Sequence, residues 1–431
     1  MTIKKPFLLM IAALAIINAC KKDSEPTTTA PIVYPDVAEV SSSIVLADVN
    51  GVKVYNGGFG SSMVQDPKDS AVFYMLTDRG PNIDGTVTNQ KVFAKPDFAP
   101  QIGKFRLKDK ALVLESTIEL KNEAGVKLTG LPNPQGQGGT GETAISTTGA
   151  ALAPSVDGLD PEGMVLAPDG TFWVSDEYGP HLVHFDATGK TIERINPFST
   201  GARKLPLVFA RRRANRGMEG LAITPDGKTL VGMMQFPLYN PSSTAITGSL
   251  AIRILTFDIA TGTTKQFVYL MDKASLQAIS EITAITNSTF LVIERDGEFP
   301  TQANKSTVVK KIYKIDLTNA TDVSDPTNSA EGKLYGGKTL EELKTADVLA
   351  MNGIVPVTKT LVADLMVDVP TLYAHDKAEG IVIINKNMIA ICNDDDFGVN
   401  GTGTYAAKIL VGNNNEIDKN RIYFIKLKQP L

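Results

Sequence analysis

The chain has 431 residues, of which 43% are hydrophobic and 21% are charged, so it can bury a large core. Its net charge of −4 gives no basis for nucleic-acid binding. With only two cysteines and three histidines, the composition excludes a cysteine-based zinc site and disfavours a histidine-rich zinc or iron site.

The N-terminus predicts a targeting segment. Two lysines precede an apolar run over residues 6–17 that is too short to span a membrane comfortably. The run ends in Ile17-Asn18-Ala19-Cys20, which resembles the lipobox of bacterial lipoproteins. We therefore expect a signal peptide over residues 1–19 and lipidation of Cys20. The alternative is an ordinary secretory signal with a cysteine there by chance.

A polar segment rich in Thr and Pro over residues 20–37 predicts a flexible tether, followed by a folded domain over residues 38–431. Lys21, directly after the lipidated position, favours a lipid anchor in the outer membrane, with the domain facing the periplasm or the cell surface. The other cysteine, Cys392, lies in an apolar strand, and we expect no disulfide.

Strand patterns dominate the folded domain. A run of small residues over 57–62 precedes a strand over 72–77 that ends in Asp78-Arg79. Residues 121–157 follow, and their Gly-rich composition predicts a long surface insertion.

Residues 160–197 predict a four-stranded antiparallel meander. We expect strands over 164–166, 172–175, 182–185 and 191–196, joined by tight turns such as Pro168-Asp169-Gly170. Four short strands in under forty residues are typical of one blade of a β-propeller, whose first strand lies nearest the central axis.

The antiparallel geometry of this blade brings acidic residues together. Glu162 precedes the first strand, and Asp176 and Glu177 follow the second. Because neighbouring antiparallel strands run in opposite directions, the start of one lies beside the end of the next. We expect these carboxylates at one end of the blade, near the channel.

The chain repeats this unit. Residues 216–227 closely match 160–170, and further copies begin at Glu281 and Glu379. From Glu281 to the acidic strand end at Glu294 is 13 residues, and from Glu379 to Asn393 is 14. The second copy lacks the acidic strand end and has Gln235 there.

Repetition predicts an all-β protein, a β-propeller of six or seven four-stranded blades. Two longer intervals, Asp78 to Asp176 and Glu281 to Glu379, are 98 residues each, and each could hold one degenerate blade. A strand over 421–428 is expected to help close the ring, and residues 340–349 are the best helix candidate.

Five motifs in order resemble the phytase-like family, often described as esterase-like activity of phytase. They begin at Thr77-Asp78-Arg79-Gly80-Pro81, Ser175-Asp176-Glu177-Tyr178-Gly179, Asn215-Arg216-Gly217-Met218-Glu219, Glu294-Arg295-Asp296 and Glu379-Gly380, and the resemblance covers residues 57–427. It implies a β-propeller, possible hydrolysis of phosphoesters or esters, and bound calcium.

The repeated acids would form a candidate metal site at the channel mouth. An inner ring comprises Glu162, Glu219, Glu281 and Glu379, and an outer ring comprises Asp78, Asp176, Glu177, Glu294, Asp296, Asn393, Asp394 and Asp395. Crowded carboxylates repel one another, and a hard cation with oxygen ligands such as Ca²⁺ relieves that repulsion. The alternative is that these acids hold neighbouring blades together by bonding to amides and arginines.

Arg79, Arg216 and Arg295 recur beside the acids. They could bind an anionic substrate with guanidinium groups, or could simply pair with the carboxylates. His181 and His375 should lie at the acidic mouth, where His181 is a candidate general acid or base, although a solvated loop histidine is the plainer interpretation. No serine nucleophile motif is present.

We therefore expect a lipid-anchored, monomeric, metal-dependent hydrolase that acts on a phosphoester or ester of a small anionic substrate. Catalysis would rest on Glu162, Glu219, His181 and the three arginines. Two alternatives remain open at this stage: a non-catalytic propeller that binds a glycan, peptide or protein, and a lactonase-type propeller.

Overall fold

The structure is a computed structural model that describes residues 1–2, 32–41, 44–139, 141–274 and 277–431. The predicted signal peptide, Cys20 and most of the tether lie outside the described residues. Residues Tyr34–Leu431 form one compact unit. Within the described ranges, no helix has the length and apolar character needed to cross a membrane.

The compact unit is a β-propeller of four-stranded antiparallel blades, which confirms the predicted fold class. The blades, from inner to outer strand, are β4 (Ser62–Gln65), β5 (Val72–Leu76), β8 (Gln101–Lys108) and β9 (Ala111–Glu119); β12 (Pro161–Leu166), β13 (Phe172–Asp176), β14 (Leu182–Phe185) and β15 (Thr191–Ile195); β16 (Met218–Ile223), β17 (Thr229–Met234), β18 (Ala251–Asp258) and β19 (Thr264–Leu270); β20 (Ala278–Ala284), β21 (Thr289–Arg295), β22 (Lys310–Asp316) and β23 (Thr358–Asp364); and β24 (Ile381–Asn385), β25 (Met388–Cys392), β30 (Arg421–Lys426) and β1 (Val37–Val40).

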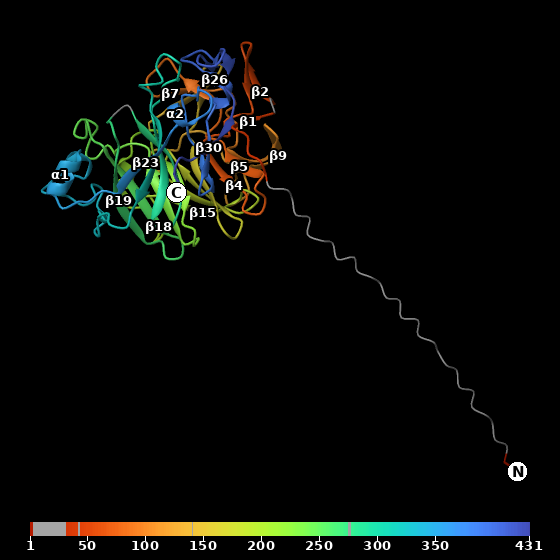
Figure 1. Ribbon diagram of the computed structural model, residues 1–431. Helices are drawn as coiled ribbons and strands as arrows, with labels where there is room; N and C mark the ends of the chain where they lie inside the picture. The colour runs from red at the N-terminus through yellow and green to blue at the C-terminus, as the bar shows by residue number, and fades with distance from the viewer. Residues whose placement is uncertain (3–31, 42–43, 140, 275–276) are drawn as a thin grey trace. The chain divides into compact units, whose positions relative to one another are not determined.

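The inner strands close a ring of five blades within the described residues. Strands β4, β12, β16, β20 and β24 contact one another in that order, and β24 contacts β4. The last blade combines both ends of the unit, because β1 pairs antiparallel with β30 and parallel with β9. Figure 1 shows β1 in red beside β30 in blue.

The expectation of six or seven blades was wrong, because the two 98-residue intervals contain no additional blade among the described residues. The first interval holds β8 and β9, which complete the first blade, and a separate mixed sheet. This sheet consists of β6 (Asn82–Asp84), β7 (Gln90–Phe93), β10 (Thr143–Ser146) and β11 (Ala151–Leu152). The second interval holds the outer strands of the fourth blade and an excursion between β22 and β23.

Short elements decorate the blades. They are the hairpins β2 (Val45–Val49) with β3 (Val52–Tyr55), β26 (Val399–Asn400) with β27 (Ala406–Ala407), and β28 (Ile409–Leu410) with β29 (Glu416–Ile417); the 3₁₀ helices Leu207–Arg211, Glu341–Leu343 and Asp396–Gly398; and the helices α1 (Ala346–Met351) and α2 (Leu365–Asp368). The helix expected over 340–349 is thus split into a 3₁₀ turn and α1.

Candidate functional site

Two cavities lie at opposite ends of the inner strands β12, β16, β20 and β24. One cavity, of about 440 Å³, lies where the inner strands begin. It is lined by Asp78, Arg79, Asn82, Ile83, Asp84, Lys91, Asp160, Glu162, Glu177, Asn215, Arg216, Glu219, Gln235, Phe236, Gln277, Ala278, Arg295, Asp296, Gly297, Lys377, Glu379, Asp396, Val399, Asn400 and Gly401. The predicted gathering of carboxylates from distant parts of the chain therefore occurs here.

Bulges in the inner strands aim the glutamates. In β12, Pro161 pairs with Asp176 but the next paired residue is Met164, so Glu162 lies in the irregular segment. In β16, Met218 pairs with Met234 and then Gly220 with Met233, which leaves Glu219 out of register. A bulge redirects a side chain locally. This turns each glutamate toward the axis instead of leaving it on one face of its sheet.

The glycine after each glutamate allows the inner strands to approach closely. A Cβ on Gly163 would lie 2.5 Å from the backbone nitrogen of Leu221 on β16. A Cβ on Gly220 would lie 2.8 Å from the backbone nitrogen of Ile282 on β20. The repeated Glu-Gly pair therefore combines an acidic side chain at the cavity with a backbone that only glycine permits.

One group of acids in the cavity, which we call the open cluster, consists of Asp160, Glu162, Glu177, Glu219 and Glu379. Carboxylate oxygens of Asp160, Glu162 and Glu177 lie within 4.8 Å of one another. Oε1 of Glu177, Oε2 of Glu219 and Oε2 of Glu379 are buried and accept no hydrogen bond from an N–H or hydroxyl donor within the described part of the chain. The carboxyl groups of Glu177 and Glu219 can hydrogen-bond each other when Glu177 is protonated. Glu162 has no hydrogen bond or ion pair to any described residue. The open cluster thus presents unsatisfied oxygens to the cavity.

Amide oxygens add to this set. Gln235 donates a hydrogen bond through Nε2 to Oε1 of Glu219, at 2.5 Å, while its own Oε1 is buried and unsatisfied. Oδ1 of Asn215 is also buried without a hydrogen-bond partner among the described residues. The glutamine that departs from the acidic repeat therefore still supplies an oxygen to the cavity, without a charge.

Burial raises the pKa values of the open cluster. The pKa of Glu219 rises to about 7 through burial and the nearby Glu379, and the pKa of Glu379 also rises to about 7, mainly through burial. Burial likewise raises the pKa of Asp160 to about 7 although Arg79 opposes it. Burial and Glu219 raise the pKa of Glu162 and Glu177 well above the usual range. Near neutral pH these acids need protons or a cation.

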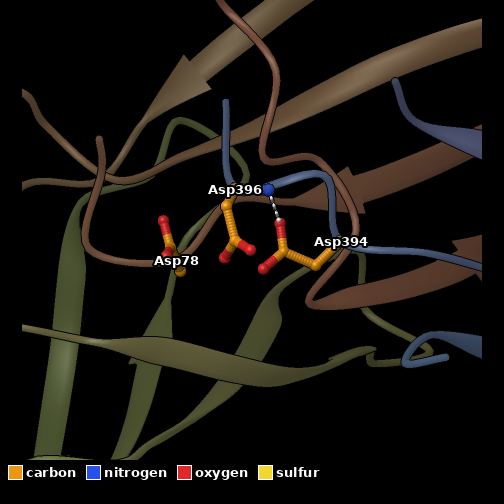
Figure 2. A group of neighbouring side chains, drawn as sticks. All are labelled: Asp78, Asp394 and Asp396. Atoms are coloured by element: carbon orange, nitrogen blue, oxygen red, sulfur yellow. Dashed lines mark hydrogen bonds between the residues drawn. The ribbon is translucent and has the colours of Figure 1, made fainter. Parts of the chain in front are cut away.

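A second group, which we call the lysine-paired cluster, consists of Asp78, Asp394 and Asp396. Figure 2 shows their carboxylates turned toward one another, with the Asp396 backbone nitrogen donating to Asp394 Oδ1 at 3.0 Å. Lys377 Nζ donates to Asp394 and Asp396 at 2.6 Å each. Lys408 Nζ donates to Asp396, also at 2.6 Å. Two lysines therefore donate directly to this cluster, whereas Glu162 of the open cluster has no such partner among the described residues.

The pKa values within the lysine-paired cluster diverge. Lys377 and Lys408 lower the pKa of Asp396 despite its burial. Burial raises the pKa of Asp394 to about 7, because it outweighs Lys377 there. The aspartate that both lysines contact is the one held in its charged form.

Two of the three predicted arginines are occupied by carboxylates. Arg79 Nη1 lies 3.1 Å from Glu142 and its Nε lies 3.5 Å from Asp160. Arg295 Nη2 donates to Glu379 at 2.7 Å and lies 3.8 Å from Glu219. At these two positions the ion-pair interpretation matches the structure.

Several predicted residues lie outside the cavity lining. Glu281 points across the axis, where it accepts hydrogen bonds from Ser62 Oγ and from the Leu221 backbone at 2.8 Å, and it borders the opposite cavity. Glu294 instead accepts from Tyr269 and Lys359 between strands. The expectation that both would line the acidic mouth is therefore corrected.

Three outer-ring residues near strand ends also form structural hydrogen bonds instead of lining the cavity. Asp176 is fully buried and accepts from the Asp160 and Gly179 backbones, both at 2.7 Å. Asp395 accepts from the Gly58 backbone at 2.6 Å. Asn393 donates to Asp418 at 3.2 Å. These side chains fix the loops around the cavity, whereas Asp296 lines it.

His181 and His375 do not lie at the mouth, which corrects that expectation. His181 Nδ1 lies 2.5 Å from Asp176, and burial together with Arg194 lowers its pKa to about 4. His375 is fully buried between Asp418, at 2.7 Å, and the Tyr423 hydroxyl, at 2.8 Å. Neither ring reaches the cavity lining.

Sequence reasoning missed several polar residues of the cavity, among them Asp160, Gln235, Lys377 and Asp396. Asp160 directly precedes the first repeated strand, and Asp396 ends the acidic run after β25, so their positions in the repeat could have identified them. Lys377 carries no such signal, because it lies in an irregular segment before Glu379.

Comparisons with known proteins match the chain to one family. Residues 55–397 match the family model described as "Phytase-like: Esterase-like activity of phytase". A curated relative from Arthroderma benhamiae, described as an uncharacterized secreted protein, is 28% identical over 344 residues, which cover 64% of this chain and 67% of the relative.

Solved structures resemble the chain only weakly. A GH43 endo-arabinanase from Bacillus licheniformis is 12% identical, covers 88% of this chain and 96% of its own, and has a TM-score of 0.36. A periplasmic gluconolactonase from Pseudomonas aeruginosa is 9% identical, covers 88% of each chain, and has a TM-score of 0.35.

Proposed function

The chain belongs to the phytase-like family described as esterase-like activity of phytase, and we propose that it is a metal-dependent hydrolase of phosphoesters or esters of small anionic molecules. The open cluster is the proposed catalytic centre. The observation that carries this proposal is the set of unsatisfied, buried carboxylate oxygens that three different blades direct into one cavity.

The residues present fit a hard divalent cation such as Ca²⁺. Glu162, Glu177 and Glu219 offer carboxylate oxygens, and Asn215 and Gln235 offer neutral amide oxygens that are buried and unsatisfied. Mixed carboxylate and amide oxygens in irregular geometry suit calcium better than softer metals. A bound cation of this kind would polarise a substrate oxygen and lower the pKa of water.

The remaining acids would handle protons. Glu379 has a pKa of about 7, close to physiological pH, which is the range in which a carboxyl group serves best as a general acid or base. Arg295, which donates to Glu379 at 2.7 Å, would fix the orientation of that carboxylate. The sequence left a carboxylate or His181 as the proton carrier, and we propose Glu379, because His181 does not line the cavity.

We also propose that the protein acts outside the cytoplasm, as a lipid-anchored protein of the outer membrane. The targeting segment and the lipobox-like motif ending in Cys20 support this location. The secreted relative from Arthroderma benhamiae supports export.

The test combines metal binding with turnover. Purified mature protein is titrated with Ca²⁺ by calorimetry, and phosphoester, carboxylic ester and lactone panels are assayed with and without chelator. We expect Glu162→Gln to weaken Ca²⁺ binding at least tenfold and to reduce turnover at least a hundredfold. Glu119→Gln, which affects a surface pair with Lys127, is the matched control.

Two results would overturn the proposal. One is chelator-insensitive turnover that Glu162→Gln leaves unchanged. The other is the absence of both Ca²⁺ binding and hydrolysis in the wild type, which would favour a non-catalytic binding propeller.

A further inference from the structure

Arg216 differs from the other two arginines of the cavity in its exposure. The side chain of Arg216 is 37% exposed, against 6% for Arg79 and 11% for Arg295. Its nearest carboxylate oxygen, Glu177 Oε2, is 3.9 Å from Nη1, which is too long for a hydrogen bond. Within the described residues, its guanidinium donates only to the carbonyl of neighbouring Asn215. A guanidinium has five N–H donors, so most of these donors remain available.

The backbone around Arg216 is held in place beside the open cluster. Asn215 has a left-handed φ of 49°, and Arg216 forms an isolated β-bridge with Arg213. The Gly217 carbonyl accepts from the Gln235 backbone at 3.1 Å. A Cβ on Gly217 would lie 2.3 Å from the Glu177 carbonyl oxygen. The loop therefore presents Arg216 from a fixed position next to Glu177.

An aromatic ring supports the guanidinium at the same edge of the cavity. Phe236 lines the cavity and is half-buried. The guanidinium carbon of Arg216 lies 5.9 Å from the centre of this ring, and that of Arg213 lies 5.0 Å from it. Stacking on a ring leaves the in-plane N–H groups of an arginine free to bind an anion.

From this arrangement we infer that Arg216 is the specificity-determining residue that selects substrates with an anionic group, which it binds while the apolar body of the substrate packs on Phe236. This inference deepens the proposed function and rests on it. Arg79 and Arg295 have a different role, because their donors already hold Asp160, Glu142 and Glu379 in position.

The proposal concerns binding and can be tested without turnover. Phenylphosphonate, which combines a non-hydrolysable anion with an aromatic ring, is titrated into the full mature protein by calorimetry, once with Ca²⁺ and once with chelator. We expect Arg216→Gln to weaken phenylphosphonate binding ten- to a hundredfold, as for a lost charge-assisted hydrogen bond, and Arg216→Lys to recover part of the affinity. Phe236→Ala should weaken binding by a smaller factor.

Arg213→Gln is the matched control, because Arg213 stacks on the same ring but does not line the cavity. We expect it to change affinity less than twofold. Where a substrate is turned over, Arg216→Gln should raise KM for an anionic aryl ester but not for the corresponding neutral ester.

Wild-type protein that does not bind phenylphosphonate in either condition, or an Arg216→Gln variant that binds it as well as wild type, would overturn the inference. If only the proposed function fails, the protein neither binds Ca²⁺ nor hydrolyses a substrate. It still binds phenylphosphonate in the presence of chelator, and Arg216→Gln still weakens that binding.

Discussion

The cavity holds two acidic clusters that are alike in burial but different in charge compensation. The lysine-paired cluster has Lys377 and Lys408 within 2.6 Å of its carboxylates. The open cluster has arginines at its margins, but Glu162 and one oxygen each of Glu177, Glu219 and Glu379 are left without a hydrogen bond from an N–H or hydroxyl donor among the described residues.

This difference indicates which cluster needs an external cation. An isolated buried charge is costly, and a chain-supplied lysine removes that cost permanently. Where no lysine is supplied, the carboxyl groups must take up protons or bind a metal ion. The lysine-paired cluster therefore resembles a structural element of the closing blade, and the open cluster resembles a binding site. The following predictions test that distinction.

The largest effect is expected from removing the lysine of the paired cluster. Lys377→Met would remove the lysine that pairs with Asp394 and leave Asp396 with Lys408 alone, and it should lower the free energy of unfolding by roughly 2 to 4 kcal/mol. Urea denaturation with chelator present measures this change. Lys127→Met, at an exposed ion pair with Glu119, should cost less than about 0.5 kcal/mol. Equal effects in the two variants would contradict the structural role of Lys377.

Calcium should stabilise the protein through the open cluster alone. At a Ca²⁺ concentration about a hundred times Kd, the free energy of unfolding should rise by about 2.7 kcal/mol. Glu162→Gln should abolish this gain, whereas Asp78→Asn, in the lysine-paired cluster, should retain it. Thermal unfolding with Ca²⁺ or chelator provides the comparison, and a gain lost in Asp78→Asn would assign the cation to the other cluster.

The pH dependence of stability should distinguish metal-free from metal-loaded protein. Asp160, Glu219 and Glu379 have pKa values of about 7 when folded, against roughly 4 when unfolded. The folded state therefore binds more protons between these values, and metal-free stability should fall as the pH rises from about 5 to 8. Ca²⁺ binds the ionised carboxylates and should flatten this fall. Metal-free stability that rises over the same range would contradict the raised pKa values.

The smallest effect concerns His181. Because its ring is buried against Asp176 and does not line the cavity, His181→Gln should cost about 1 kcal/mol of stability and leave Ca²⁺ affinity unchanged. Calorimetric titration of the variant checks this. A tenfold loss of Ca²⁺ affinity would instead link His181 to the site.

The sequence repeat predicted the propeller fold but not the number of blades. Glu-Gly pairs at Glu162, Glu219 and Glu379, and turns such as Pro168-Asp169-Gly170, identify three of the inner hairpins. The outer strands vary in length and spacing. Two intervals between repeats are long because of insertions. One contains the separate sheet of β6, β7, β10 and β11, and the other contains the excursion with α1. Each insertion adds about as much length as a hidden blade would.

The sequence predicted those site residues that lie at the ends of repeated strands. Glu162, Glu219 and Glu379 line the cavity because each begins an inner strand. Which acids are neutralised depends on loops from other blades, and sequence spacing contains no information about such contacts. Arg79 reaches Asp160, and Arg295 reaches Glu379, from a neighbouring blade.

The pairing of β1 with β30 in one blade constrains the order in which the chain can fold. The partner of Val37 is Tyr423, so β1 completes its antiparallel pairing only when the distant strand β30 is present. A growing or partly exported chain therefore exposes an unpaired edge of β1 until β30 is available. Export before folding, or protection by a chaperone during that interval, would suit such an architecture better than folding blade by blade on the ribosome.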